Sequence, residues 1–164
     1  MQNNPLLSKN NQPYNTIPFN DIKTEHYIPA IKEGIKINEN EINDIVKNRE
    51  EPNFENTILA IEKSGELLDS ITTTYFHLFG SESDSEFQQL ANEISPMLAK
   101  LENDINLNTE LFKKVEFVYK KYYSDMNSDD KKLTEIIYKD FVRNGSKLNK
   151  DKKNKLREID NKLS

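Results

Sequence analysis

Apolar residues recur at intervals of three and four along most of the sequence, which is the spacing of one face of an α-helix. Before that pattern begins, residues 1–23 contain three prolines and show no sustained period, which predicts an extended N-terminal arm. The periodic segments predict helices over residues 25–48, 53–79, 84–104, 108–122, 128–144 and 149–163. The expected fold class is therefore all-α, with about six helices in an irregular antiparallel bundle.

Capping residues mark several of these helix ends. Asn108 and Ser128 are predicted N-caps, because their side-chain oxygens can accept hydrogen bonds from the first free backbone N–H groups. Gly80 and Gly145 are the expected stops of their helices. Gly65 falls inside the predicted helix 53–79, where glycine costs about 1 kcal/mol relative to alanine. We therefore expect another helix to cross closely at Gly65.

The apolar stripes predict which side chains face the core. They include Ile31, Ile45, Ile58, Leu68, Tyr75, Phe79, Ile94, Val115, Ile136, Ile137 and Phe141. In the last helix, Leu156, Ile159 and Leu163 form an apolar seam at positions i, i+3 and i+7. No stop signal follows this seam, so we expect a longer protein, with residues 24–164 forming a helical region that is truncated at its C-terminus.

Composition supports a helical protein and excludes several classes. With 4 Gly and 6 Pro in 164 residues, a turn-rich β fold is disfavoured. The absence of cysteine excludes disulfides and thiolate metal sites. No apolar run approaches about 18 residues, and the N-terminus lacks the features of a secretory signal. A cytoplasmic protein without a membrane partner is expected.

Charge is unevenly distributed along the chain. Residues 1–112 carry 8 Lys+Arg against 19 Asp+Glu, whereas residues 113–164 carry 15 against 9. A basic C-terminal part can indicate nucleic-acid binding. Acidic residues are interspersed through it, however, and no aromatic-studded groove motif accompanies them. The favoured interpretation is solvated helix faces plus contact with an acidic neighbour, and no nucleic-acid partner.

No set of residues with the spacing of an active site is present. His26 and His77 are the two histidines, and neither has a second imidazole at the i+4 spacing that zinc sites on helices use. The acidic pairs Glu50–Glu51 and Asp129–Asp130 fall in loops or first helical turns, where carboxylates complement the helix dipole. Aromatic residues such as Tyr75, Phe76 and Phe79 have core spacing and are expected in the core. We therefore predict no catalytic, cofactor-binding or metal-binding residue in this chain.

Several blocks of sequence, in order and together covering nearly the whole chain, resemble the N-terminal helical region of the thimet oligopeptidase family of zinc metallopeptidases. The likeness is closest to the bacterial peptidyl-dipeptidase branch, Dcp. The blocks are NPLL (4–7), IKTEHYIPA (22–30), EGI (33–35), FENTI (54–58), SGELL (64–68), EISP (93–96), YKDFVR (138–143) and LREI (156–159).

The resemblance implies a function for the longer protein rather than for this chain alone. In the family, a His-Glu-x-x-His helix and a downstream Glu hold the catalytic zinc, and none of these residues has a counterpart here. The family's N-terminal helices form one wall of a channel that admits short peptides. This chain would then be a non-catalytic wall and substrate gate of a peptidase that removes dipeptides from peptide C-termini. Its partners would be the catalytic region and, through the parent protein, short peptides.

Two other interpretations remain open from the sequence. The chain could be a stand-alone helical module that binds peptides or proteins without cleaving them. It could also be a nucleic-acid binder that uses residues 113–164, which would require strongly salt-dependent binding.

Overall fold

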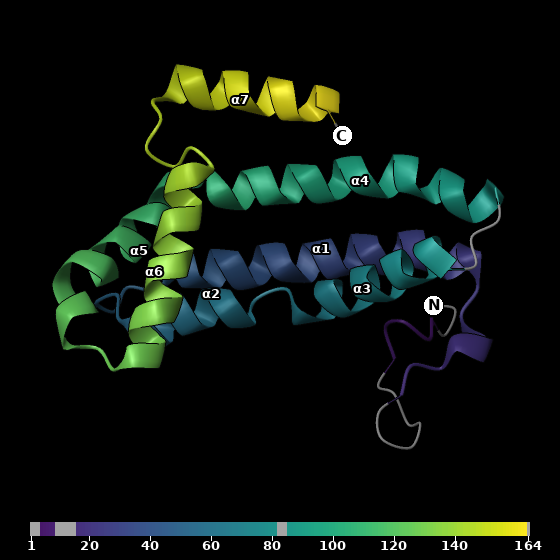
Figure 1. The fold of residues 1–164 in the computed structure, drawn as a ribbon, viewed down its shortest axis with the longest axis horizontal. Helices are drawn as coiled ribbons and strands as arrows, with labels where there is room; N and C mark the ends of the chain where they lie inside the picture. The colour runs from purple at the N-terminus through teal and green to yellow at the C-terminus, as the bar shows by residue number, and fades with distance from the viewer. Residues whose placement is uncertain (1–3, 9–15, 82–84, 164) are drawn as a thin grey trace. The chain divides into compact units, whose positions relative to one another are not determined.

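The computed structural model describes residues 4–8, 16–81 and 85–163, and their regular elements are all helical, which confirms the all-α prediction. Figure 1 shows the path of the chain through these elements. The α-helices are α1 (Thr24–Lys47), α2 (Ala60–Lys63), α3 (Glu66–Ser81), α4 (Ser85–Asn106), α5 (Thr109–Tyr122), α6 (Ser128–Arg143) and α7 (Lys150–Leu163). Three shorter helical segments are η2 (Phe19–Asp21), the π-helical η3 (Phe54–Leu59) and η4 (Tyr123–Asp125).

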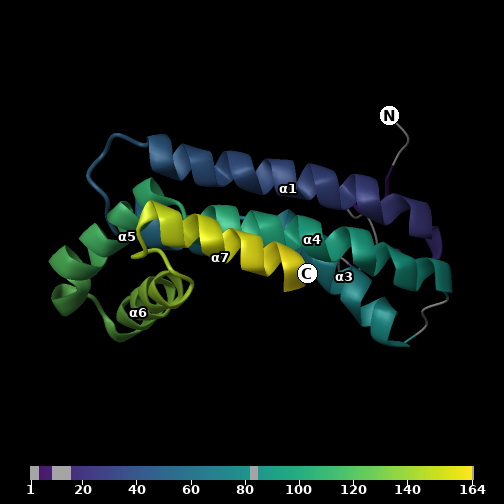
Figure 2. The same ribbon diagram turned by 90° about the horizontal axis from the view of Figure 1, so that it is seen from above.

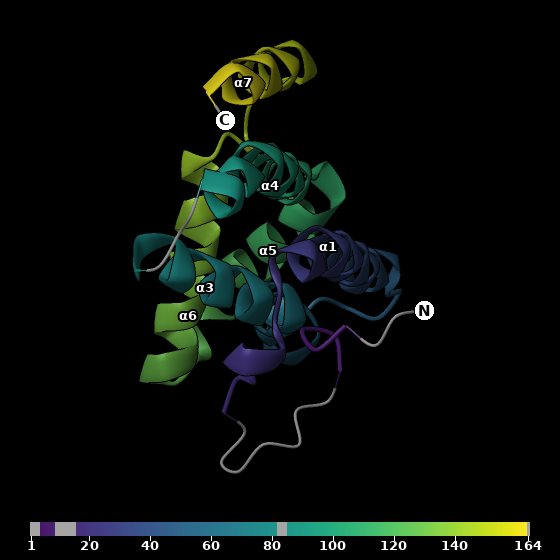
Figure 3. The same cartoon turned by 90° about the vertical axis from the view of Figure 1, so that its right-hand side faces the viewer.

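The chain forms two compact units, and α1 and α4 each contribute to both. The first unit consists of Met1–Asn38 and Gly65–Ser95. Within it, α3 lies beside the N-terminal part of α1 (Figures 1 and 3). An aromatic cluster fills the space between them, in which the Tyr27 ring lies 5.3 Å from Tyr75 and 5.4 Å from Phe87. Ile31, Leu68, Ile71 and Ile94 complete this buried core.

The second unit consists of Glu39–Ser64 and Pro96–Ser164. Its core is a cluster of buried side chains from α1, η3, α5 and α6, namely Ile42, Ile45, Ile58, Leu111, Phe112, Val115, Val118, Ile137 and Phe141. Helices α5 and α6 pack against each other, with the rings of Phe112 and Phe141 6.0 Å apart. Helix α7 runs along the C-terminal half of α4 (Figures 1 and 2).

Most of the predicted helix ends are confirmed, but Gly80 lies inside α3, which extends to Ser81, and so does not end its helix as predicted. The Asn108 side chain accepts hydrogen bonds from the backbone N–H groups of Glu110 and Leu111, each at 3.0 Å, and so caps α5. The predicted cap Ser128 is wrong by one residue, because Asn127 accepts the corresponding bonds and Ser128 is already helical. An asparagine oxygen reaches those amides as well as a serine oxygen does, so the cap type does not discriminate between the two residues.

The predicted helix over residues 53–79 is wrong as a single element. Its first turns are the π-helical η3, in which Asn53 and Asn56 exchange side-chain-to-backbone hydrogen bonds of 2.8 and 2.9 Å. The helix stops after α2 because Ser64 adopts an extended conformation and Gly65 a positive φ of 80°. The close approach expected at Gly65 is confirmed: a Cβ atom there would lie 2.0 Å from Nδ2 of Asn38 on α1.

Three aromatic or aliphatic side chains expected in the core are exposed instead. Phe76 and Phe79 on α3 are 46% and 37% exposed, and Ile136 on α6 is 44% exposed. Each lies next to, or one turn from, a residue that takes the inward position, such as Tyr75 or Ile137. Because successive residues of a helix point about 100° apart, Phe76 and Ile136 cannot face the same core as their neighbours Tyr75 and Ile137. Phe79 shares the face of Tyr75 but lies in the last turn of α3.

The described part of the N-terminal arm contacts the first unit. Residues 4–8 form a turn in which Leu7 and Ser8 donate backbone hydrogen bonds to the carbonyl of Asn4. The Asn4 side-chain amide donates to the carbonyl of His26 at 2.8 Å, which joins this turn to α1. Residues 9–15 of the predicted arm lie outside the described residues.

Candidate functional site

The loop between α1 and η3, residues 48–53, contacts α5 through charged side chains. The Glu51 carboxylate accepts hydrogen bonds from the Lys121 ammonium, at 2.7 Å, and from the Tyr122 hydroxyl. The Lys121 hydrogen bond, followed by that of Tyr122, lowers the pKa of Glu51. Lys114 reaches the same loop and donates to the Asn48 carbonyl at 2.7 Å. Glu51 therefore pairs with α5, rather than with a helix dipole as its position suggested.

The two histidines have ordinary surroundings. The Nδ1 atom of His26 accepts a hydrogen bond of 3.0 Å from the backbone N–H of Lys23, just ahead of α1, which is a capping contact. The His77 side chain is exposed on α3. Asp129 and Asp130 occupy the first turn of α6, as predicted. Within residues 4–8, 16–81 and 85–163, no group of three His, Asp or Glu side chains could hold a metal ion.

Lys153 is the most buried cation among the described residues, with 6% of its surface exposed. Its ammonium donates to the carbonyl of Leu107 at 3.1 Å and to the Thr109 hydroxyl at 3.0 Å. Burial, with a smaller contribution from the charge of Arg157, lowers the pKa of Lys153. The contact joins α7 to the turn between α4 and α5, and no reactive partner lies at the ammonium. Lys153 is therefore a structural contact.

A groove of about 480 Å³ opens in the first unit beside Tyr27. Its walls include Phe19, Leu78 and Phe87, with Lys23 at its edge. The Tyr27 hydroxyl is buried without a hydrogen-bond partner among the described residues. Burial raises the pKa of Tyr27 to about 12, with a smaller contribution from Tyr75, so this phenol stays protonated at neutral pH. No general base or nucleophile accompanies it.

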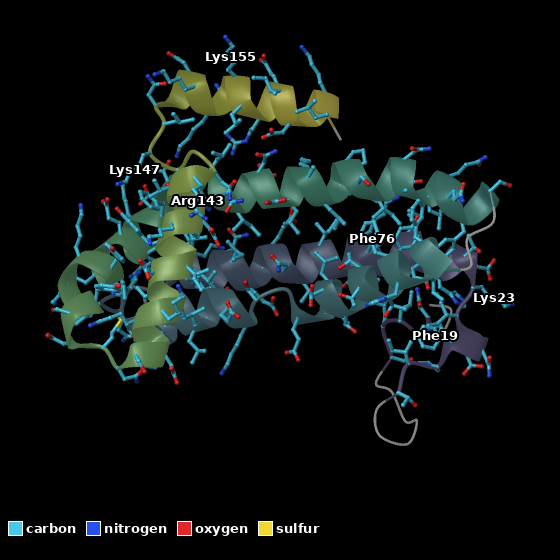
Figure 4. All side chains as sticks on the ribbon, viewed as in Figure 1. Phe19, Lys23, Phe76, Arg143, Lys147 and Lys155 are labelled. Atoms are coloured by element: carbon cyan, nitrogen blue, oxygen red, sulfur yellow. The ribbon has the colours of Figure 1, made fainter. Side chains whose placement is uncertain are left out.

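A second groove, of about 400 Å³, lies between the C-terminal half of α4 and α7. Carboxylates (Glu102, Asp160), amides (Asn103, Asn106, Asn144), the Arg143 guanidinium and the apolar side chains Ala99, Leu156 and Leu163 line it. Figure 4 shows Arg143 at the end of α6 next to this region. Such a wall can hold a polar or peptide-like segment, but it lacks a nucleophile with an activating base.

Comparison of the sequence with those of known proteins identifies relatives of this chain. No family model matches the chain. Dipeptidyl carboxypeptidase of Escherichia coli is 40% identical over 155 residues, which is 94% of this chain and 23% of that protein. Dipeptidyl carboxypeptidase of Salmonella typhimurium is 37% identical over 96% of this chain, and oligopeptidase A of E. coli is 24% identical over 98%. The chain is homologous to part of these peptidases of the thimet oligopeptidase family.

The chain spans about a quarter of the length of the curated relatives that it matches, 23% in each case. Sequence reasoning identified the family, but it missed both Lys153 and the Tyr27 hydroxyl as unusual groups. Lys153 lies in a lysine-rich helix, where nothing in the residue order separates the buried lysine from the exposed ones.

No helix in the described ranges combines the length and the apolar character that crossing a bilayer would need.

Proposed function

We propose that this chain is the non-catalytic N-terminal helical region of a zinc-dependent oligopeptidase of the peptidyl-dipeptidase type. In that protein it would form part of the wall of the substrate channel and restrict entry to short peptides. The parent enzyme would release dipeptides from peptide C-termini. A cytoplasmic location, a zinc ion in the remaining part of the enzyme and peptide substrates belong to the same proposal.

The observation that supports this proposal most strongly is the unequal similarity to two kinds of peptidase. Identity to the dipeptidyl carboxypeptidases is 37–40%, against 24% to the E. coli oligopeptidase A, over nearly all of this chain. The similarity extends through both compact units, so it is not confined to one local motif. It favours the dipeptidyl carboxypeptidase type of activity for the parent protein.

The residues of this chain do not fit the zinc site that the family uses. Zinc in a catalytic site takes three protein ligands of the His, Glu, Asp or Cys type. The chain has two histidines, no cysteine, and no metal-binding group of three among its described residues. No catalytic step is therefore assigned to any residue here, and the proposed contribution is to shape and access.

The first test is to read the gene beyond codon 164 and to assay the protein that it encodes. The reading frame should contain a His-Glu-x-x-His helix, and the longer protein should release C-terminal dipeptides from short peptides, detected by mass spectrometry. A metal chelator should abolish this activity, with E. coli dipeptidyl carboxypeptidase as the active control. A frame without the zinc motif would refute the proposal.

The second test uses the 164-residue chain itself. It should hydrolyse no peptide, with or without added zinc, and calorimetric titration with short peptides should detect weak binding or none. Zinc-dependent hydrolysis by this chain would contradict a non-catalytic role. Tight peptide binding without hydrolysis would instead support the stand-alone binding module.

A further inference from the structure

Helix α7 is attached to the second unit through its polar side. Lys153 donates to Leu107 and Thr109 at the turn between α4 and α5, and Arg157 lies 3.6 Å from the carboxylate of Asp104 on α4. Both residues are less exposed than the lysines around them. An amphipathic surface helix normally turns its apolar stripe inward and its charges outward. In α7 the side that faces the body carries Lys153, Arg157 and Asp160 next to Leu156.

Part of the apolar stripe of α7 is left uncovered. Leu163 is 81% exposed and Ile159 is 45% exposed, although Leu156 and one side of Leu163 line the groove beside α4. These residues are three and four positions apart, so they lie on one face of the helix. Exposed aliphatic side chains that share one face of an otherwise highly charged helix are typical of a surface that another element covers.

Three lysines lie within or beside this stripe. At about 100° per residue, Lys155 and Lys162 fall next to Ile159 on the side opposite Lys153, and Lys152 falls between Ile159 and Leu163. All three are exposed, and none has a carboxylate within 4.0 Å among the described residues. Figure 4 shows Lys155 pointing away from α4. The open face of α7 thus combines two exposed aliphatic side chains, Ile159 and Leu163, with three exposed lysines.

We propose that this face, formed by Ile159, Leu163, Lys152, Lys155 and Lys162, docks an amphipathic helix from the remaining three quarters of the peptidase. The docked helix would carry an apolar stripe bordered by Asp or Glu residues. This inference rests on the proposed function, because the occupant is a part of the parent enzyme. The relatives supply the necessary length, since the chain spans only 23% of them.

A second copy of the chain fits this face less well. Two α7 helices packed face to face would bring the three lysines of one copy close to those of the other, and like charges repel. A stable homodimer also buries at least roughly 1,200 Å² in total, which two partly exposed aliphatic side chains do not supply. An acidic, amphipathic partner removes both objections, because it pairs the lysines and covers the stripe.

Hydrogen–deuterium exchange tests the proposal directly. The exchange of amides 155–163 should be measured by mass spectrometry in the 164-residue chain and in the longer peptidase. We expect these amides to exchange at least about tenfold more slowly in the longer protein. Equal exchange in an active longer protein would overturn the docking inference while leaving the proposed function intact. A longer protein without peptidase activity would refute the proposed function instead.

Substitutions separate the docked face from the rest of α7. In the longer protein, Ile159→Asp with Leu163→Asp should remove the added protection, as should the charge reversals Lys155→Glu with Lys162→Glu. Asn154→Asp, an exposed position on the other side of the helix, is the matched control and should retain it. If the 164-residue chain instead shows protection that increases with its own concentration, a second copy covers the face and the proposed occupant is wrong.

Discussion

Replacing Gly65 by alanine tests why the predicted helix over residues 53–79 is interrupted. Gly65 has a φ of +80°, and an L residue in that region costs about 1–2 kcal/mol. The new Cβ would also lie 2.0 Å from Nδ2 of Asn38, a buried side chain that would have to move by more than 1 Å. Overpacking of this kind costs about 1–3 kcal/mol.

A smaller effect acts in the opposite direction. Alanine lowers the conformational entropy of the unfolded chain relative to glycine, and this favours the folded state by about 0.4–1 kcal/mol. The free energy of unfolding of Gly65→Ala should therefore fall by about 2–3 kcal/mol. Urea unfolding of the 164-residue chain, followed by circular dichroism, measures the change. Gly80→Ala is the matched control, because no atom lies within 4 Å of its new Cβ and its helical position gains up to about 1 kcal/mol.

A double-mutant cycle separates the two costs. In an Asn38→Ala background the clash disappears, so Gly65→Ala should cost only about 1 kcal/mol, the part due to the positive φ. The coupling between the two positions should then be about 1–2 kcal/mol. If Gly65→Ala is as stable as the wild type, or if Asn38→Ala leaves its cost unchanged, the explanation of the helix break is wrong.

Three further predictions compare matched positions in the same unfolding assay. Tyr27→Phe removes a buried hydroxyl that has no hydrogen-bond partner among the described residues and should raise the free energy of unfolding by about 1 kcal/mol. Tyr75→Phe breaks a buried hydrogen bond of 3.0 Å and should lower the free energy of unfolding by about 1 kcal/mol. Ile137→Ala should cost about 2–4 kcal/mol and the exposed Ile136→Ala less than about 1 kcal/mol; similar costs would contradict the assigned orientation of α6. Folding lowers the pKa of Lys153 from 10.5, so with increasing pH the folded chain loses this proton before the unfolded chain does. The free energy of unfolding of the wild type, relative to that of Lys153→Met, should therefore rise as pH increases toward 10.5. A constant difference between those two proteins over that pH range would show that Lys153 does not titrate as described.

The helices were predictable where local signals agree with one another. In α5, the Asn108 cap and the stripe of Leu111, Val115 and Val118 point to the same boundaries and the same face, and all three side chains are fully buried. Repetition of the apolar residue every three or four positions is enough to orient such a helix. That no residue of this chain is catalytic stays a prediction, which the hydrolysis assay of the 164-residue chain tests.

The features that could not be predicted depend on contacts between distant segments. Gly65 is compatible with either a close helix crossing or a break, and only the position of Asn38 and the backbone of Ser64 distinguish these. The buried state of Lys153 depends on carbonyl and hydroxyl groups 46 and 44 residues away. In such cases tertiary contacts override local propensity, and a single sequence carries no record of them.

Helices α5 and α7 show how pattern and burial together carry information that neither gives alone. Both have apolar residues at helical spacing, but the stripe of α5 is fully buried, whereas Ile159 and Leu163 on α7 are 45% and 81% exposed. If α7 were a helix that simply remains in solvent, its apolar residues would have no reason to share a face. If it were anchored through its stripe alone, Lys153 would not occupy the buried position and Ile159 would not be exposed. The stripe and the buried lysine are explained together when α7 lies between two surfaces, one polar and present in this chain, the other apolar and acidic and supplied by the rest of the peptidase.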